Sequence, residues 1–283
     1  MNKCREKYQA DLFFYLCDLL KFTGLKKGKD TLFLITNDDS IHARGLKVLI
    51  DIVRKLGKVY VIAPQESQSG MSHAITVKTP LRIRKILQED DCSMVSCNGT
   101  PVDCVKLALN KLIDRKPDMI ISGINHGSNS SASIVYSGTM AAALEGCING
   151  IPSIGFSLLD YSPDADFTGI VQYAEKIIVR ALENGIPQGT CLNVNFPANH
   201  AEEIRGIKIC RQTKGLWVEE FDQRVDPQNR TYYWLTGDYI NLEPDADDTD
   251  EWALHNNYIS MVPVQPDLTS YKAIPHLKKW KFD

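Results

Sequence analysis

The fold of this chain is decided by residues Thr31 to Gly45, which read TLFLITNDDSIHARG. The first six residues form a short apolar run rich in β-branched and aromatic side chains, which predicts a buried strand. The run ends in Asn37-Asp38-Asp39-Ser40, where two adjacent carboxylates repel each other unless a cation or several donors offset their charge. Because open α/β sheets bind ligands at the carboxyl ends of their strands, this position indicates a hard divalent cation held by oxygen ligands.

A second interpretation of the same two aspartates needs no metal. Asp and Asn side chains turn the chain and cap helices, so Asp38 and Asp39 could serve only the turn into the next helix. From this segment alone the two interpretations weigh equally.

Composition excludes several classes of function. The chain has 283 residues, is 43% hydrophobic and 24% charged, and has a formal net charge of -3, as an ordinary globular protein does. Such a charge gives no argument for binding nucleic acid or a membrane surface, and no stretch is long enough to span a bilayer. The eight cysteines lack the paired spacing of a zinc site, so we expect reduced, packed thiols in a cytoplasmic protein.

From residue 31 to residue 195 the sequence alternates short strands with amphipathic helices, which predicts βαβ units and a mostly parallel sheet. The expected strands are 31–36, 59–63, 94–97, 117–122, 151–157 and 190–195, with two extended pieces around Pro80. The expected helices are 45–55, 102–112, 139–148 and 167–183. Right-handed crossovers then place the strand-to-helix loops on one edge of the sheet. We therefore expect four pieces to converge there: Asp38-Asp39, the loop of Ser69, Asn125, and Ser137-Gly138-Thr139.

Two further regions flank this core of residues 31–200. Residues 1–30 form an appendage, in which 10–25 have the pattern of an amphipathic helix. Residues 201–283 form a β-rich region with antiparallel strands expected at 204–211 and 230–235, an acidic turn-rich piece at 244–251, and a strand at 258–264. Because a small β-rich region has little core of its own, its aromatic residues must pack on the α/β core or on another subunit.

Each loop is a weak signal alone. Ser69-Gly70 could be a loop tip, Asn125 a turn residue and Ser137 a helix N-cap, although a helix N-terminus also binds phosphate readily. His42 and His73 could be ligands or acid-base groups, but the simpler interpretation is that each is a surface or hydrogen-bonded histidine. No Walker motif is present, and no G-x-G-x-x-G follows a strand, so nucleotide binding by those routes is not supported.

In combination and in order, the motifs closely resemble the SurE family of survival proteins, which are metal-dependent nucleoside-monophosphate phosphatases. The matching segments are 36–39 with Gly45, 63–64, 68–70, 98–105, 117–118, 122–129, 136–143, 145–146, 192–197 and 249–250. They extend from about residue 31 to about residue 269, which is most of the chain.

The resemblance implies a Rossmann-like core and one divalent ion per subunit, Mg²⁺ or Mn²⁺, on Asp38, Asp39, Ser69 and Asn125. It places phosphate on a second set of residues, namely Asn129, Ser137, Gly138 and Thr139. The implied reaction is hydrolysis of 5′-nucleotides, and by extension 3′-nucleotides, by metal-activated water, with Asp38 and Asp39 as the catalytic residues. The implied assembly is a homodimer with exchanged C-terminal arms, or a homotetramer joined through a hairpin near residues 231–235.

The sequence departs from the family pattern at Ser40, where the family usually has glycine. Glycine adopts a positive φ easily, so Ser40 implies either a compatible backbone or mild strain. Residues 1–30 have no counterpart in the pattern.

Two other classes of protein use similar residues. A receiver-like signalling domain also has paired acids after its first strand, but it is about half as long and needs further residues that have no candidate here. A non-catalytic, metal-dependent nucleotide sensor would use the same ligands, and it stays open.

Overall fold

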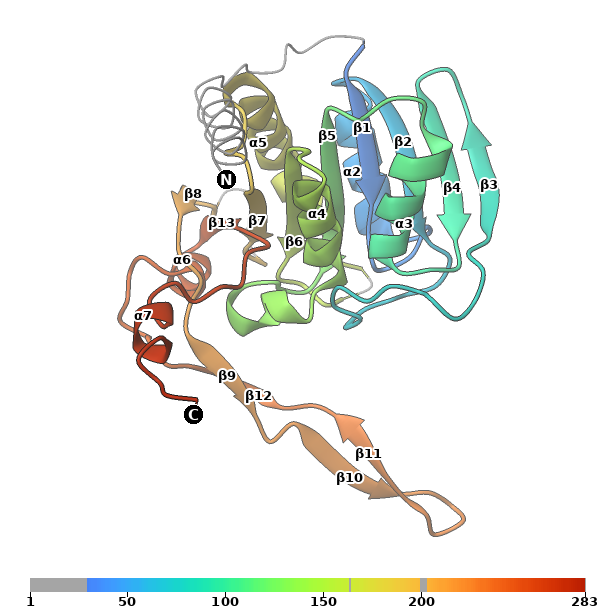
Figure 1. The fold of residues 1–283 in the computed structure, drawn as a ribbon. Coiled ribbons are helices and arrows are strands. Elements are labelled where there is room, and N and C mark those ends of the chain that lie inside the picture. The colour runs from blue at the N-terminus through green and yellow to red at the C-terminus, as the bar shows by residue number, and fades with distance from the viewer. Residues whose placement is uncertain (1–29, 163, 199–202, 283) are drawn as a thin grey trace.

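A computed structural model of the chain describes residues 30–162, 164–198 and 203–282. Nine of the described strands form one sheet in the order β3-β4-β2-β1-β5-β6-β7-β13-β8, with helices on both faces (Figure 1). This is the α/β architecture that the sequence predicts. The helix expected at 10–25 lies outside the described residues.

The elements of the sheet and its helices follow the expected alternation. The sheet contains β1 (Leu32–Thr36), β2 (Lys58–Pro64), β3 (Ile83–Gln88), β4 (Cys92–Cys97), β5 (Met119–His126), β6 (Ser153–Leu158), β7 (Cys191–Phe196), β8 (Gly206–Ile209) and β13 (Tyr258–Val264). The α-helices are α2 (Arg44–Val53), α3 (Pro101–Leu107), α4 (Gly138–Ile148), α5 (Val171–Asn184), α6 (Asp250–His255) and α7 (Ile274–Leu277). Short helical turns cover η1 (Ala108–Leu112), η2 (Ser131–Val135) and η3 (Thr168–Ile170). Around Pro80 only β3 forms, not the two extended pieces that were expected.

Strand β1 lies in the middle of the sheet and is parallel to β2 and β5. Phe33 and Ile35 pack in the core beneath α2 and α5, whereas Leu34 packs in the core beneath α3 and α4. Successive residues of a strand point to opposite faces, so an uninterrupted apolar run is what a strand covered on both sides requires. Asp38 and Asp39 therefore follow directly after a strand that is buried on both faces.

One crossover differs from the expected hand. Connections β5-α4-β6 and β6-α5-β7 step in the same direction along the sheet, yet α4 packs beside α3 and α5 packs beside α2, on opposite faces. The two connections therefore have opposite hands, and the expectation of uniformly right-handed crossovers is wrong for β6-α5-β7. Because β5, β6 and β7 remain parallel, their carboxyl ends still share one edge.

The region after residue 200 divides between the sheet and an arm. Strand β13 is antiparallel to β7 and parallel to β8, so the main sheet continues into this region. Strands β9 (Gly215–Val218) and β12 (Asp238–Asn241) form one antiparallel pair, and β10 (Phe221–Val225) and β11 (Thr231–Leu235) form another. Together they project from the body as a long arm (Figure 1). The expected strands exist, but β8 runs parallel to β13, a partner distant in sequence, and β11 pairs with β10 in a local antiparallel hairpin.

The described residues also bear on the expected environment of the chain. Within residues 30–162, 164–198 and 203–282, no helix is both long and apolar enough to cross a bilayer. The six described cysteines are all buried free thiols, as expected from their apolar surroundings.

Candidate metal and phosphate site

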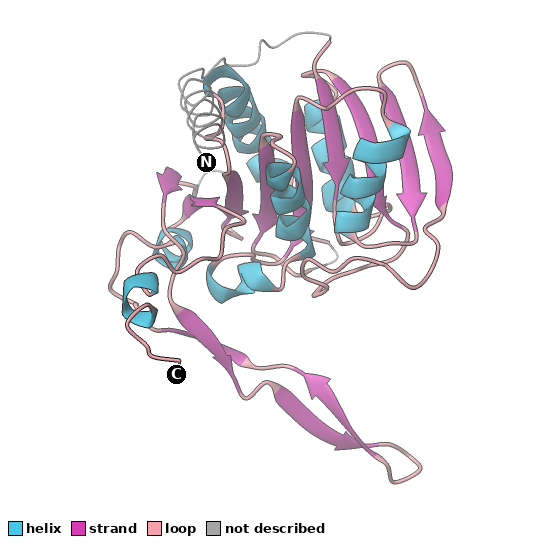
Figure 2. Ribbon diagram, in the orientation of Figure 1, coloured by secondary structure: helices cyan, strands magenta, loops and turns pink. Residues whose placement is uncertain are grey.

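The candidate site lies where β1, β2 and β5 end and α4 begins. Figure 2 shows the connecting loops gathered along this lower edge of the sheet, from which the arm also projects. Thr36 at the end of β1 lies opposite Ser122 of β5, so Asn125 follows three residues further along the neighbouring strand. Parallel pairing thus brings the Asp38 loop and Asn125 to the same place, as the sequence predicts.

Asp38 is almost completely buried, at 3% exposure. Its Oδ1 accepts a hydrogen bond from the Thr139 hydroxyl, and its backbone oxygen accepts one from Gln68 N at 2.7 Å. Burial and then the charge of Asp39 raise the pKa of Asp38 to about 6, against the opposing effect of the hydrogen bonds from Thr139.

Asp39 is half-buried, and its Oδ2 accepts a hydrogen bond from the backbone nitrogen of His126 at 3.1 Å. Burial raises the pKa of this carboxyl as well, despite the hydrogen bond and the nearby His126 ring. A bound cation would stabilise the ionised forms of these two adjacent carboxyls, so their raised pKa values are typical of a cation site.

The other oxygen atoms near the two aspartates suit a hard divalent cation. Neither aspartate forms an ion pair with a basic side chain of the described residues. Asn125 donates its Nδ2 to the Gly127 oxygen at 2.9 Å, which leaves its own Oδ1 available as a ligand. The buried Oδ1 of Asn37 has no hydrogen-bond partner within the described ranges. Nowhere in those ranges do three His, Cys, Asp or Glu side chains cluster, so neutral oxygens would have to complete the shell, which suits Mg²⁺ or Mn²⁺ better than zinc.

Ser69 lies on the exposed loop that follows β2. The loop is tied to the site through the adjacent residue, because it is Gln68 N that donates to the Asp38 backbone oxygen. The Ser69 hydroxyl is 3.0 Å from the Ser67 hydroxyl. The structure therefore brings Ser69 beside the Asp38 loop, and its predicted role as a ligand stays a prediction.

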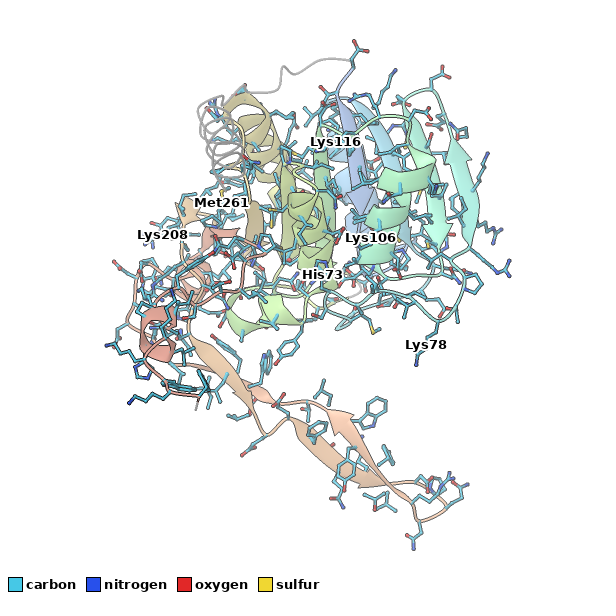
Figure 3. The ribbon with its side chains drawn as sticks, viewed as in Figure 1. His73, Lys78, Lys106, Lys116, Lys208 and Met261 are labelled. Carbon is cyan, nitrogen blue, oxygen red and sulfur yellow. The ribbon has the colours of Figure 1, made fainter. Side chains whose placement is uncertain are left out.

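A buried carboxylate on α4 anchors the same loop. His73 Nε2 lies 3.2 Å from Glu145 Oε2, and Lys106 Nζ of α3 lies 2.9 Å from Glu145 Oε1. Figure 3 labels the two basic residues, His73 and Lys106. Burial alone would raise the pKa of Glu145, but the hydrogen bonds from Lys106 and His73 hold it below its ordinary value. The ionised Glu145 thus links the Ser69 loop to the helix that starts at the site, which makes His73 a positioning residue rather than a ligand.

Helix α4 begins directly against Asp38. Its N-cap, Ser137, accepts a hydrogen bond from Met140 N at 2.9 Å. A Cβ at Gly138 would lie 2.8 Å from both Cβ and Oδ2 of Asp38, so only glycine lets the helix start so close to the carboxylate. The positive end of a helix attracts anions, so this arrangement suits a phosphate held beside a cation. In this structure the Thr139 hydroxyl holds Asp38, and contact of Thr139 with phosphate stays a prediction.

Asn129 is held in place by the side chains of Asn193 and Asn195. Both belong to the matching segment 192–197, but no role was assigned to them from the sequence. Asn129 N donates to Asn195 Oδ1 at 2.8 Å, and Asn193 Nδ2 donates to the Asn129 oxygen at 2.8 Å. Asn129 Nδ2 donates to the Ser157 hydroxyl at 2.7 Å, which leaves one amide hydrogen for a ligand. The available signal was the spacing: Asn193 and Asn195 are two residues apart, so they share one face of β7.

Asp250 is a buried residue that belongs to one of the matching segments, although no role was assigned to it from the sequence. It accepts hydrogen bonds from Thr213 N and from Ser131 N, both at 2.9 Å, and so ties η2, just before α4, to the C-terminal region. The expected turn-rich piece ends two residues earlier, at Thr249, because Thr249 caps α6 by accepting from Trp252 N. A Thr-Asp pair before a helical run is a capping pattern that would have shown this boundary.

Ser40 adopts the strained backbone that the missing glycine would have favoured. Its φ is +102°, in a region that glycine adopts without strain. The Asn37 side chain donates to the Ser40 oxygen at 2.9 Å and so holds this turn closed.

Comparisons with known proteins all indicate one family. The family model described as "Survival protein SurE" matches residues 33–219. A protein named 5′-nucleotidase SurE from Flavobacterium psychrophilum is 52% identical over 250 residues, covering 88% of this chain and 97% of the relative. A protein of the same name from Flavobacterium johnsoniae is 51% identical over 258 residues, covering 91% and 99%. The crystal structure of the SurE protein from Aquifex aeolicus is similar with a TM-score of 0.76 and 39% identity, covering 87% of this chain and 98% of that chain.

Proposed function

The chain belongs to the SurE family, and from this premise we propose that it is a metal-dependent nucleotidase, which hydrolyses nucleoside monophosphates to nucleoside and phosphate. One observation supports the proposal above all: the buried Asp38, next to the half-buried Asp39, lies against the start of α4. The carboxylates suit a cation and the helix N-terminus suits a phosphate dianion, so the two halves of a phosphomonoesterase site lie side by side. Relatives are named for 5′-nucleotides, and we extend the proposal to 3′-nucleotides.

We assign one Mg²⁺ or Mn²⁺ ion to Asp38, Asp39, Ser69 and Asn125. When bound, the ion supplies Lewis-acid chemistry, which polarises a phosphoryl oxygen and activates water. The two neutral ligands limit the negative charge of the shell to that of the two aspartates, so a phosphate dianion can still approach.

The chain's own groups act by positioning and by offsetting charge. The Thr139 hydroxyl orients Asp38, and the amide groups at Ser137 and Gly138, with the remaining amide hydrogen of Asn129, would hold phosphoryl oxygens as negative charge grows on them. We assign no covalent nucleophile, since Asp38 Oδ1 is already engaged by Thr139 and a carboxylate that binds a cation attacks poorly.

Phosphate release tests the proposal directly. We expect release from 5′-AMP and 3′-AMP with Mn²⁺, no release in EDTA, and no release by Asp38→Asn with Mn²⁺. Asp51→Asn, which removes the same charge from an exposed position on α2, should retain full activity. A wild-type protein that binds the nucleotide with Mn²⁺ but releases no phosphate would refute hydrolysis and favour the non-catalytic nucleotide sensor.

We further propose that the chain forms a homodimer or homotetramer through its C-terminal region. The arm exposes Tyr233 at 59% and Trp234 at 60%, together with Leu235 and Phe221. Contiguous apolar surface of this kind on a thin two-stranded arm marks a protein contact. The six buried free thiols support a reducing compartment, the cytoplasm.

A further inference from the structure

A pocket lies between the turn after β1 and the edge hairpin of β3 and β4. It has a volume of 320 Å³ and is lined by His42, Gln65, Arg84, Lys85, Ile86 and Ser96. Pockets that bind small ligands start at about 300 Å³. His42 and Gln65 come from the two loops that also form the candidate site, and these loops are joined by Ile41 N, which donates to the Pro64 oxygen at 2.8 Å.

The pocket is basic. Neither Arg84 nor Lys85 makes an ion pair or a side-chain hydrogen bond with any described residue. Arg84 lies directly opposite Ser96 in the antiparallel pairing of β3 and β4, so their side chains share one face of the sheet. The pairing register shifts between Lys85 and Leu87, which marks a β-bulge. Because a bulge interrupts the strict alternation of side chains, the neighbouring residues Arg84 and Lys85 can both line the pocket.

Ser96 favours a ligand-binding pocket over an edge strand that only carries protective charges. Basic residues on an edge strand also prevent pairing with other chains, and this would account for Arg84 and Lys85 by itself. It does not account for Ser96, which is only 3% exposed, lines the pocket, and has no side-chain hydrogen bond with any residue that the structure describes. The Ser96 hydroxyl is not among the fully buried atoms that lack a partner, so it reaches the pocket and is free to donate to a ligand there.

We propose that this pocket binds a phosphate-type oxyanion, at a site separate from the phosphate position at the start of α4. The Arg84 guanidinium offers a forked pair of donors, Lys85 adds a second positive charge, and the Ser96 hydroxyl donates from the pocket wall. Because His42 and Gln65 belong to different loops, an anion held between them links these loops beside Asp38. The site requires neither the metal nor hydrolysis, and its ligand is either free phosphate or the phosphate group of a nucleotide.

Calorimetric titration of inorganic phosphate into the full-length protein in EDTA tests the proposal. We expect Arg84→Gln and Ser96→Ala each to weaken phosphate binding, Arg84→Gln by about tenfold, since a charge-assisted hydrogen bond is lost. Arg84→Lys should fall between wild type and Arg84→Gln, because it retains the charge and loses the fork. Lys78→Gln is the matched control: it removes one exposed positive charge from the loop before β3, where Figure 3 labels Lys78. Lys78 does not line the pocket, so this variant should bind phosphate like the wild type.

The outcomes separate the two explanations of these basic residues. If wild type binds no phosphate, or if Arg84→Gln and Ser96→Ala bind it as Lys78→Gln does, the proposal is wrong and the charges serve only to protect the edge strand. Thermal melts of each variant confirm that a loss of binding is not a loss of folding. Competition then identifies the source: displacement of phosphate by AMP but not by adenosine assigns the site to a nucleotide phosphate, and no displacement by either assigns it to free phosphate.

Discussion

Replacing Asp38 by asparagine should stabilise the metal-free protein, and more so as the pH rises. Burial and Asp39 raise the pKa of Asp38 from 3.8 to about 6, so ionisation costs the folded state free energy that the unfolded state does not lose. About two pKa units correspond to about 3 kcal/mol of lost stability above pH 6, and the penalty is absent well below pH 4. Because the folded-state pKa is the higher one, this group lowers stability as the pH rises from about 4 to about 6. The asparagine side chain cannot ionise, so the Asp38→Asn variant escapes the penalty.

Urea unfolding in EDTA at pH 5 and pH 8 measures the effect. The advantage of Asp38→Asn over wild type should grow by roughly 1–2 kcal/mol between the two pH values, since about half of the penalty is already present at pH 5. Asp51→Asn, which removes an exposed carboxylate, should show no such growth. An advantage of Asp38→Asn that is the same at both pH values would refute the electrostatic account of the site, and so would a variant that is less stable than wild type at pH 8.

Four further experiments test separate parts of the molecule. Ser40→Gly should raise the free energy of unfolding in urea by about 1 kcal/mol by relieving the positive φ, with activity unchanged; a less stable variant would contradict the strain. Thr139→Ala should lower kcat and raise KM in phosphate-release assays, and Thr139→Ser should restore most of the loss through its hydroxyl. Ser69→Ala should raise the Mn²⁺ concentration needed for half-maximal activity, and an unchanged requirement would remove Ser69 from the ligands. Deleting residues 219–237 of the arm should lower the mass seen by light scattering, and an unchanged oligomer would show that the arm does not hold it together.

The position of the site could be predicted because it depends on few assumptions. Asp38 follows one buried strand, Asn125 ends another, and Gly138 starts a helix, so a parallel sheet alone suffices to bring them to one edge. Local patterns of apolar residues and turn residues predicted the end of β1 and the start of α4 to within one residue, whereas the strand expected at 117–122 continues to His126.

What could not be predicted depends on partners distant in sequence. The amphipathic pattern of α5 is the same on either face of the sheet, so it holds no information about the hand of its crossover. Likewise the pairing of β8 with β13, and the hydrogen bond from Thr139 to Asp38, depend on how separate elements dock to within a fraction of an ångström. Ser40 is an intermediate case: the family pattern predicts a choice between strain and a compatible backbone, and only the φ angle decides it.

The order of strands in the sheet has a consequence for synthesis on the ribosome. Strands β1 to β7 are complete once Phe196 has been added, but β7 is covered on its outer side by β13, which begins only at Tyr258. About 60 residues lie between them, so at roughly 5–20 residues per second the hydrogen-bonding edge of β7 stays open for several seconds in the nascent chain. An open edge can pair with neighbouring chains, and β7 includes Asn193 and Asn195, which hold Asn129. Asn193 and Asn195, which hold Asn129, therefore lie on a strand with an open edge until β13 has been synthesised.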